Sequence, residues 1–205
     1  MTVFYFVRHG VTDHTGHRLS GWMEGIHLND EGRHQAEVAA DVLADKRLKA
    51  VYSSPIDRCY ETAEAIAARH RKLLVTTDHD IGEVGYGRWT NRPLRGLMRT
   101  KLWQTVQRRP SAVTFPDGES FRSVQSRAVN AVERIGEKHK RDSVCLVSHG
   151  DVIKLVLAHY VGIHIDHFQR IVIAPASVST LAVGDGSVQL WSLNAMPMTI
   201  PGRSA

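Results

Sequence analysis

The chain has 205 residues, a net charge of +5, 42% hydrophobic residues and 23% charged residues. This composition is ordinary for one large folded domain and excludes wholesale disorder, collagen and coiled coil. No apolar run approaches the roughly 20 residues of a membrane span, and the positive charge favours an anionic partner without requiring nucleic acid.

The start of the chain and its cysteines predict a cytoplasmic protein. The apolar run at residues 3–7 is too short for the core of a signal peptide and follows no basic segment. Cys59 and Cys145 are too few for a disulfide framework, so we expect reduced, buried thiols.

The chain opens with a predicted strand, a helix and a second strand. Residues 3–7 form an unbroken run of β-branched and aromatic residues, which is typical of a strand buried on both faces of a parallel sheet. Asn29 is an N-cap residue followed by two acidic residues, so a helix is predicted to begin there. Residues 50–53 predict a second strand.

A second helix is predicted directly after that strand. Ser54 is expected to cap it, with Pro55 at the first helical position and Asp57 completing a capping box. Residues 73–77 predict a third strand. Residues 93–106 carry apolar side chains at helical spacing, so one helix is predicted over them.

The second half of the chain continues the alternation and ends in a hairpin. Helices are predicted over residues 119–135 and 151–161, on either side of an apolar strand at 143–147. Residues 177–183 and 188–193 alternate around a Gly-Asp-Gly-Ser turn, so their pairing is expected to be antiparallel.

This order of elements predicts an α/β three-layer sandwich with a mainly parallel sheet and helices on both faces. No linker or low-complexity segment divides the chain, so a single domain is expected over residues 1–193. Two prolines and a glycine predict an irregular tail over residues 194–205.

Two predicted strands end in a histidine followed by a glycine. The first strand runs into residues 8–10 (Arg-His-Gly), and the strand at 143–147 runs into residues 148–150 (Ser-His-Gly). Ligands of open α/β sheets bind beyond the carboxyl ends of the strands, so His9 and His149 are expected at one crevice if the strands are neighbours. Each glycine is expected to allow a sharp turn and a close approach of backbone N–H groups to a ligand.

A third basic residue is expected at the same crevice. Arg58 falls in the first turn of the second predicted helix, and the helix that begins near Gly150 directs its positive dipole end to the same place. Because unpaired basic groups in one crevice are costly without an anion, Arg8, Arg58 and the two histidines predict a phosphate site.

Other chemistries fit the sequence less well. The chain contains neither the Gly-rich loop of P-loop nucleotide hydrolases nor the G-x-S-x-G turn of serine hydrolases. A metal site is not expected, because no His-Glu-x-x-His pattern occurs and the Glu-x-x-His pair at residues 31–34 has no second copy. A metal ion is therefore not expected at the four residues of the second half that could ligate one, His159, His164, Asp166 and His167.

The segments around these residues, in this order, resemble the histidine phosphatase superfamily, in its phosphoglycerate-mutase-like branch. The resemblance covers residues 2–183, and its closing part is similar to a bacterial subgroup labelled phosphomutases. The stretches that carry it are residues 8–10, Gly21, 28–36, 53–63, 81–89, 115–120, 147–150 and 168–179.

The resemblance implies a role for each basic residue and adds one acid. It implies that His9 is the nucleophile and becomes phosphorylated, that Arg8, Arg58 and His149 bind the phosphoryl oxygens, and that Glu83 protonates the leaving group. The chemistry agrees with these roles, because flanking arginines disfavour protonation of a histidine and a nearby phosphate dianion raises the pKa of a carboxyl. Fixed positive charge stabilises a transferring phosphoryl group, so no cofactor or metal ion is expected.

Further residues are candidates for contact with the substrate. Gly21 and Gly150 belong to the segments just described, and Thr15 stands where an Asn often contacts the phosphate in this family. Val11 replaces a common Glu and His27 a common Pro. Three more residues stay open between a role at the site and a purely structural one: His14, His17 and Glu119.

A cap is expected over the crevice at about residues 85–120. No acidic residue lies between Glu83 and Asp117, whereas seven basic ones do. On a single helix over 93–106, Arg95 and Arg99 share one face. Together with Arg92 they either form a solvated basic surface or bind a second acidic group of the substrate, such as a carboxylate.

The sequence therefore predicts a metal-independent phosphatase that hydrolyses a small phosphate monoester through a phosphohistidine intermediate. The chain has no room for the insertion of phosphoglycerate mutases, which favours hydrolysis over transfer between carbons. A phosphomutase that needs a bisphosphate primer and a non-catalytic module that binds a phosphorylated ligand stay as alternatives. The substrate and the oligomeric state stay open.

Overall fold

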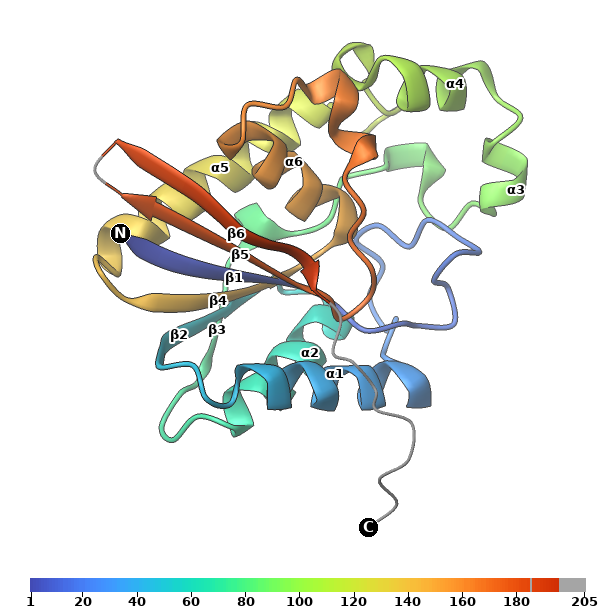
Figure 1. The fold of residues 1–205 in the computed structure, drawn as a ribbon. Helices are drawn as coiled ribbons and strands as arrows, with labels where there is room; N and C mark the ends of the chain where they lie inside the picture. The colour runs from blue at the N-terminus through green and yellow to red at the C-terminus, as the bar shows by residue number, and fades with distance from the viewer. Residues whose placement is uncertain (185, 196–205) are drawn as a thin grey trace.

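The chain folds into three layers around a six-stranded sheet (Figure 1). A computed structural model describes residues 1–184 and 186–195. The strands are β1 Thr2–Arg8, β2 Leu48–Ser53, β3 Val75–Thr77, β4 Ser143–Ser148, β5 Val178–Gly184 and β6 Ser187–Ala195. The α-helices are α1 Asp30–Leu43, α2 Asp57–Ala68, α3 Leu94–Leu97, α4 Lys101–Arg108, α5 Phe121–Lys138 and α6 Gly150–Tyr160. Because α1 and α2 cover one face of the sheet and α5 and α6 the other, the predicted sandwich is confirmed.

The first strand lies inside the sheet, whose order is β3-β2-β4-β1-β5-β6. β1 pairs in parallel with β4 and antiparallel with β5. Its side chains alternate: Phe4 and Phe6 pack in the core under α5 and α6, whereas Tyr5 and Val7 pack in the core over α1 and α2. The apolar run at residues 3–7 is therefore buried on both faces, as its sequence predicts.

The C-terminal hairpin is confirmed, with one shift at its end. β5 and β6 pair antiparallel. The predicted tail begins two residues too early, because Asn194 and Ala195 still belong to β6 and the Asn194 N–H donates to Ser179 Oγ at 3.0 Å. Residues 196–205 lie outside the described part of the chain.

The second helix begins later than its sequence predicts. α2 starts at Asp57, and its N-cap residue Ile56 makes no side-chain capping bond. The predicted cap at Ser54 is wrong because the Ser54 hydroxyl lies 2.8 Å from His149 Nε2 and accepts only a long bond of 3.4 Å from the Ile56 N–H. Arg58 nevertheless occupies the first turn, as expected.

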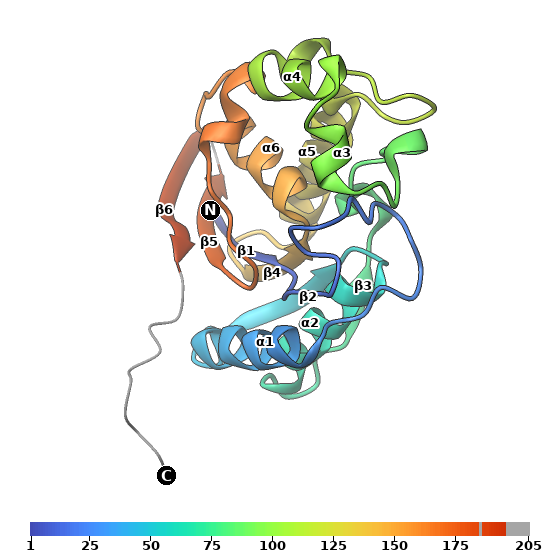
Figure 2. The same ribbon diagram turned by 90° about the vertical axis from the view of Figure 1, so that its right-hand side faces the viewer.

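The single helix predicted over residues 93–106 is wrong, because the segment forms two short helices, α3 and α4 (Figure 2). Thr100 breaks it: its hydroxyl donates to Leu97 O at 2.7 Å and accepts from the Trp103 N–H at 3.2 Å, so it caps both helices. Arg99 therefore lies between the helices, and Arg95 and Arg99 do not share one helical face.

Two smaller boundaries also differ. β3 begins at Val75 rather than at residue 73, because the Leu73 N–H bonds to His70 O in the turn after α2. α5 begins at Phe121, and its capping box joins Ser120 to Ser123. The division into one domain over residues 1–193, with a cap at about 85–120, stays a prediction.

No helix within residues 1–184 and 186–195 combines the length and the apolar character needed to cross a bilayer. The predicted cytoplasmic location stays a prediction.

The loop after β1 packs directly on the backbone of α1. A Cβ on Gly10 would lie 2.4 Å from Gly32 O, and a Cβ on Gly32 would lie 2.0 Å from Val11 O. The N–H of Gly10 donates to Thr62 Oγ1 at 3.2 Å. Gly10 is therefore required by a backbone–backbone approach to α1, and its N–H is not free for a ligand as the sequence suggested.

We expect Gly32→Ala to lower the free energy of unfolding by about 2–4 kcal/mol, because the added methyl group meets a backbone carbonyl that cannot move alone. Urea denaturation measures this loss. Gly96→Ala is the matched control, because a Cβ on Gly96 in α3 meets no atom within 4 Å, and its effect should stay below about 1 kcal/mol. Equal midpoints for both variants would contradict the packing argument.

Candidate functional site

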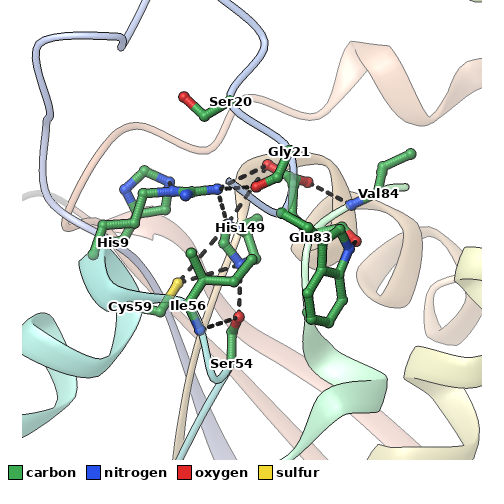
Figure 3. Close-up of polar contacts among 12 residues, drawn as sticks. His9, Ser20, Gly21, Ser54, Ile56, Cys59, Glu83, Val84 and His149 are labelled. Carbon is green, nitrogen blue, oxygen red and sulfur yellow. Dashed lines mark hydrogen bonds and ion pairs between the residues drawn. The ribbon is translucent and has the colours of Figure 1, made fainter. Parts of the chain in front are cut away.

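The carboxyl ends of β1 and β4 bring the two histidines together. Arg8 is the register partner of Ser148, and the His9 N–H donates to Ser148 O at 3.1 Å. The ring centroids of His9 and His149 lie 5.3 Å apart, at an angle of 64° (Figure 3). The two rings therefore meet at the carboxyl ends of their strands, as the strand order predicts.

Hydrogen bonds fix which nitrogen of His9 carries the proton. His9 Nδ1 lies 2.7 Å from Gly10 O, and a carbonyl only accepts, so Nδ1 is protonated. The Nε2 atom accepts from Arg58 Nε at 3.2 Å. Burial, then the charges of Arg58 and Arg8, hold the pKa of His9 well below its usual value. The ring is therefore neutral near pH 7, with a lone pair on Nε2.

The two arginines present buried N–H groups without a protein acceptor. Arg58 Nη2 donates to Gly21 O at 3.0 Å, and Arg8 Nη1 donates to Ile173 O at 2.7 Å. Within the part of the chain that the structure describes, Arg58 Nη1 and Arg8 Nε are buried and have no hydrogen-bond partner. Buried donors of this kind are expensive unless an acceptor binds, and a phosphate oxygen suits a guanidinium group.

His149 is fully buried between Arg58 and Ser54. Its Nδ1 lies 3.2 Å from Arg58 Nη2, which only donates, so Nε2 carries the proton and donates to Ser54 Oγ at 2.8 Å. Burial, and next the charge of Arg58, lower the pKa of His149 well below its usual value. The Cys59 thiol packs 3.4 Å from Nε2 (Figure 3).

Glu83 faces both basic residues from a separate segment. Its Oε1 accepts from the Val84 N–H at 2.9 Å, and its Oε2 lies 3.5 Å from His149 Nδ1 and 3.9 Å from Arg58 Nη2. Burial raises the pKa of Glu83 to about 7, against the opposing charge of Arg58. The carboxyl therefore titrates near neutrality without the phosphate dianion that the sequence argument invoked.

Apart from His149, which lies behind Arg58 and outside the lining, these groups open into one pocket of about 190 Å³. Its lining includes Arg8, His9, Arg58, Glu83, Gly150 and Thr15, all of them predicted. The residues that the sequence argument did not single out, or left open, are Thr12, His14, Gly16, Arg18, Leu19, Ser20, Tyr86, Leu94, Asp151 and Lys154. Lys154 lies one helical turn after Gly150 and Asp151, and this spacing was a usable signal. The sequence of the loop that carries Arg18 contains no comparable signal.

Arg92, Arg95 and Arg99 do not line this pocket. All three are exposed, and Leu94 is the residue of their segment that reaches it. Of the two alternatives, their exposure agrees with a solvated basic surface, and the shared arginine face is absent because the segment forms two helices. Arg18 and Lys154 supply positive charge at the pocket instead.

The other open candidates divide into lining and supporting residues. Thr15 lines the pocket, but its hydroxyl accepts from the Thr12 N–H at 2.9 Å within its own loop. Gly21 lies outside the lining and acts through its carbonyl on Arg58. His14 lines the pocket, whereas His17 does not.

Gly150 and Glu119 each have a structural role beside the site. A Cβ on Gly150 would lie 3.3 Å from Arg8 Nε, so glycine leaves room for that guanidinium. Glu119 lies outside the lining and pairs with Arg127 at 2.8 Å.

The histidine-rich part of the second half makes ordinary local contacts. His164 Nδ1 accepts from the Asp166 N–H at 3.2 Å, and Asp166 Oδ1 accepts from the Ser111 N–H at 2.8 Å. Among residues 1–184 and 186–195, no group of three or more His, Cys, Asp and Glu residues has the arrangement to hold a metal ion.

The raised pKa of Glu83 predicts a pH-dependent cost of folding. The folded state keeps a proton that the unfolded state loses between about pH 4.5 and pH 7, so this group removes stability as pH rises. The difference in the free energy of unfolding between Glu83→Gln and wild type should therefore grow in favour of the variant by about 2–3 kcal/mol as pH rises from 5 to 8. Urea midpoints at both values measure this change.

Asp166→Asn is the matched control, because the bond from the Ser111 N–H lowers the pKa of this carboxyl in spite of its desolvation, and Asp166 lies outside the pocket. Its folded and unfolded forms both lose the proton below pH 5, so its difference from wild type should stay nearly constant between pH 5 and pH 8. A Glu83→Gln difference that does not grow with pH would contradict the assigned pKa.

The family model described as the histidine phosphatase superfamily (branch 1) matches residues 4–196 of the chain. Phosphoglycerate mutase-like protein 4 of Arabidopsis thaliana is 35% identical over 158 residues, which cover 72% of this chain and 66% of that protein, just under two thirds of its length. Phosphoserine phosphatase 1 of Hydrogenobacter thermophilus is 28% identical over 170 residues, which cover 82% of this chain and 80% of that protein. Among solved structures, Bacillus stearothermophilus YhfR is similar with a TM-score of 0.85 at 28% identity, over 93% of this chain and 96% of that one.

Proposed function

Because the chain belongs to the histidine phosphatase superfamily (branch 1), we propose that it hydrolyses a small phosphate monoester through a phosphohistidine intermediate, without a metal ion. One observation carries the proposal: the unprotonated Nε2 of His9 lies in the same pocket as the buried, unpartnered donors of Arg8 and Arg58. A neutral nucleophile beside fixed positive charge is what phosphoryl transfer requires.

In the first step, the lone pair of His9 Nε2 attacks phosphorus and the bond from phosphorus to the ester oxygen breaks. Arg8 and Arg58 stabilise the charge on the remaining phosphoryl oxygens, and His149 accepts a hydrogen bond from Arg58 behind them. Glu83, whose pKa of about 7 keeps much of it protonated at neutral pH, gives its proton to the leaving oxygen. The products are an alcohol and a phosphorylated His9.

In the second step, water attacks the phosphorus and the bond from nitrogen to phosphorus breaks. The Glu83 carboxylate takes the proton of the water, which restores the acid for the next cycle. Inorganic phosphate leaves, and the lone pair returns to His9 Nε2.

The relatives support a hydrolase and keep a mutase as the second candidate. One is named a phosphoserine phosphatase and another a phosphoglycerate mutase-like protein. Product analysis separates the two reactions: a phosphatase releases one phosphate per ester consumed, whereas a mutase yields an isomeric ester and depends on a bisphosphate primer. Absence of turnover on every ester would leave only the non-catalytic binding module.

We expect His9→Ala to abolish phosphate release and covalent labelling, because the substitution removes the attacking Nε2 atom. In wild type, a rapid quench should trap a label that is stable to alkali and labile to acid, and activity should persist in excess EDTA. His17→Ala is the matched control, because His17 lies in the following loop but outside the pocket lining, and it should stay within about twofold of wild type. Appreciable turnover by His9→Ala would exclude the mechanism.

We also propose that the substrate carries a second acidic group, and that Arg18 binds it. Arg18 Nη1 donates to Asn91 O at 2.7 Å and to Asn91 Oδ1 at 3.1 Å, which fixes the guanidinium at the pocket. Within residues 1–184 and 186–195, Arg18 forms no ion pair with a carboxylate. Its position and free charge suit a carboxylate at the far end of a small ester.

Phosphorylated acids should therefore exceed neutral phosphate esters in kcat/KM by about tenfold, and Arg18→Gln should remove that preference. Steady-state kinetics on one acidic and one neutral ester measure it. Arg95→Gln is the matched control, because Arg95 is an exposed arginine of the facing segment that does not line the pocket. A preference lost in Arg95→Gln and kept in Arg18→Gln would overturn the assignment.

A further inference from the structure

The segment that carries Glu83 has no regular secondary structure of its own. It follows a short 3-10 helix, His79–Ile81, and runs through Glu83 to Gly85. A carboxyl that must meet both a leaving oxygen and a water needs a fixed backbone. The structure therefore has to hold this segment by contacts from elsewhere in the chain.

Arg127 of α5 supplies most of those contacts. Its Nη1 donates to Asp80 O at 2.7 Å and to Gly82 O at 2.9 Å, and its Nη2 donates to Glu83 O at 2.8 Å. One guanidinium thus binds three carbonyls of a four-residue stretch, which is possible because its five N–H donors form a rigid planar fork.

Glu119 completes the arrangement from the other side. It accepts from Arg127 Nε at 2.8 Å and from Nη2 at 2.9 Å, and its Oε2 also accepts from the Gly85 N–H at 2.7 Å. The backbone N–H of Glu119 donates to Gly85 O at 2.8 Å. Arg127 and Glu119 together therefore bind the backbone on both sides of Glu83, and we call this pair the Arg127–Glu119 clamp.

The clamp does not touch the reacting groups. Neither Arg127 nor Glu119 lines the pocket, and neither is hydrogen-bonded to the side chain of His9, Arg58 or Glu83. Glu83 is instead aimed by its own backbone: with the carbonyl of Glu83 bound by Arg127 and by Trp22 Nε1, its carboxylate turns to the Val84 N–H and towards His149.

We propose that the Arg127–Glu119 clamp is a positioning device for the proton donor, so that its loss slows formation of the phosphohistidine from esters whose leaving oxygen must be protonated more than from esters whose leaving group departs unaided. This inference rests on the proposed function, in which Glu83 is the acid. Alkyl phosphates need that proton, whereas p-nitrophenyl phosphate has a leaving group that departs with little help. A merely structural role would slow both substrates alike.

The test compares wild type, Arg127→Met and Glu83→Gln on glycerol phosphate and on p-nitrophenyl phosphate. In Arg127→Met, kcat/KM on the alkyl ester, which reports formation of the phosphohistidine, should fall at least about tenfold more than kcat/KM on the aryl ester, and Glu83→Gln should show the same pattern more strongly. In wild type the rate should fall above about pH 7, as Glu83 loses its proton. In Arg127→Met this fall should begin at a lower pH, because the Glu83 carboxyl leaves its buried position.

Arg134→Met is the matched control. Arg134 lies two turns further along α5 and pairs with Asp78 at 2.7 Å and with Asp80 at 3.2 Å at the surface, without contact to Glu83 or Glu119. It should keep the wild-type ratio of the two substrates. If Arg127→Met does not fold, Glu119→Ala tests the same clamp from its other half.

The outcomes separate this inference from the proposed function. Equal losses on both esters in Arg127→Met or Glu119→Ala, or no loss in either, would overturn the clamp as a positioning device while Glu83→Gln still discriminates between the esters. If wild type releases phosphate from neither ester, the proposed function itself fails.

Discussion

The guanidinium group of Arg58 is the contact on which the site depends. It donates to His9 Nε2 and to Gly21 O, and it lies 3.2 Å from His149 Nδ1. Three segments far apart in the sequence therefore meet on one planar group, and Glu83 approaches it from a fourth at 3.9 Å. Since the arginine is almost fully buried and cannot lose its charge, that charge acts on the pKa values of His9, His149 and Glu83.

The opposite protonation of the histidines and the acid follows from burial first and from the charge of Arg58 second. Burial is the largest cause for each group: it removes the proton from His9 and His149 and leaves it on Glu83. The charge of Arg58 reinforces the shift of the histidines and opposes that of the carboxyl. A neutral nucleophile and a partly protonated acid can therefore coexist near pH 7 within one small pocket.

The parts of this arrangement that follow from local sequence were predictable. The buried strand at residues 3–7, the position of Arg58 in a first helical turn and the meeting of His9 with His149 each depend on periodicity or on the topology of parallel strands. The cap of α2 was not predictable in this way, because Ser54 looks like an N-cap residue in its own segment and bonds instead to His149, 95 positions away. The break at Thr100 depends on local bonds of its hydroxyl to Leu97 and Trp103, which the spacing of the apolar residues does not reveal. The approach of Arg18 to the pocket depends on a tertiary contact with Asn91.

The unpartnered donors of Arg8 and Arg58 have a thermodynamic consequence. An anion that binds them contributes its binding free energy to the folded state only, so the stability of this chain rises with the concentration of any tetrahedral oxyanion that fits. In the proposed reaction these donors bind the phosphoryl oxygens and not the rest of the ester. Free orthophosphate therefore competes with the substrate of the proposed reaction for the same groups. A high phosphate concentration raises the free energy of unfolding and inhibits turnover at the same time.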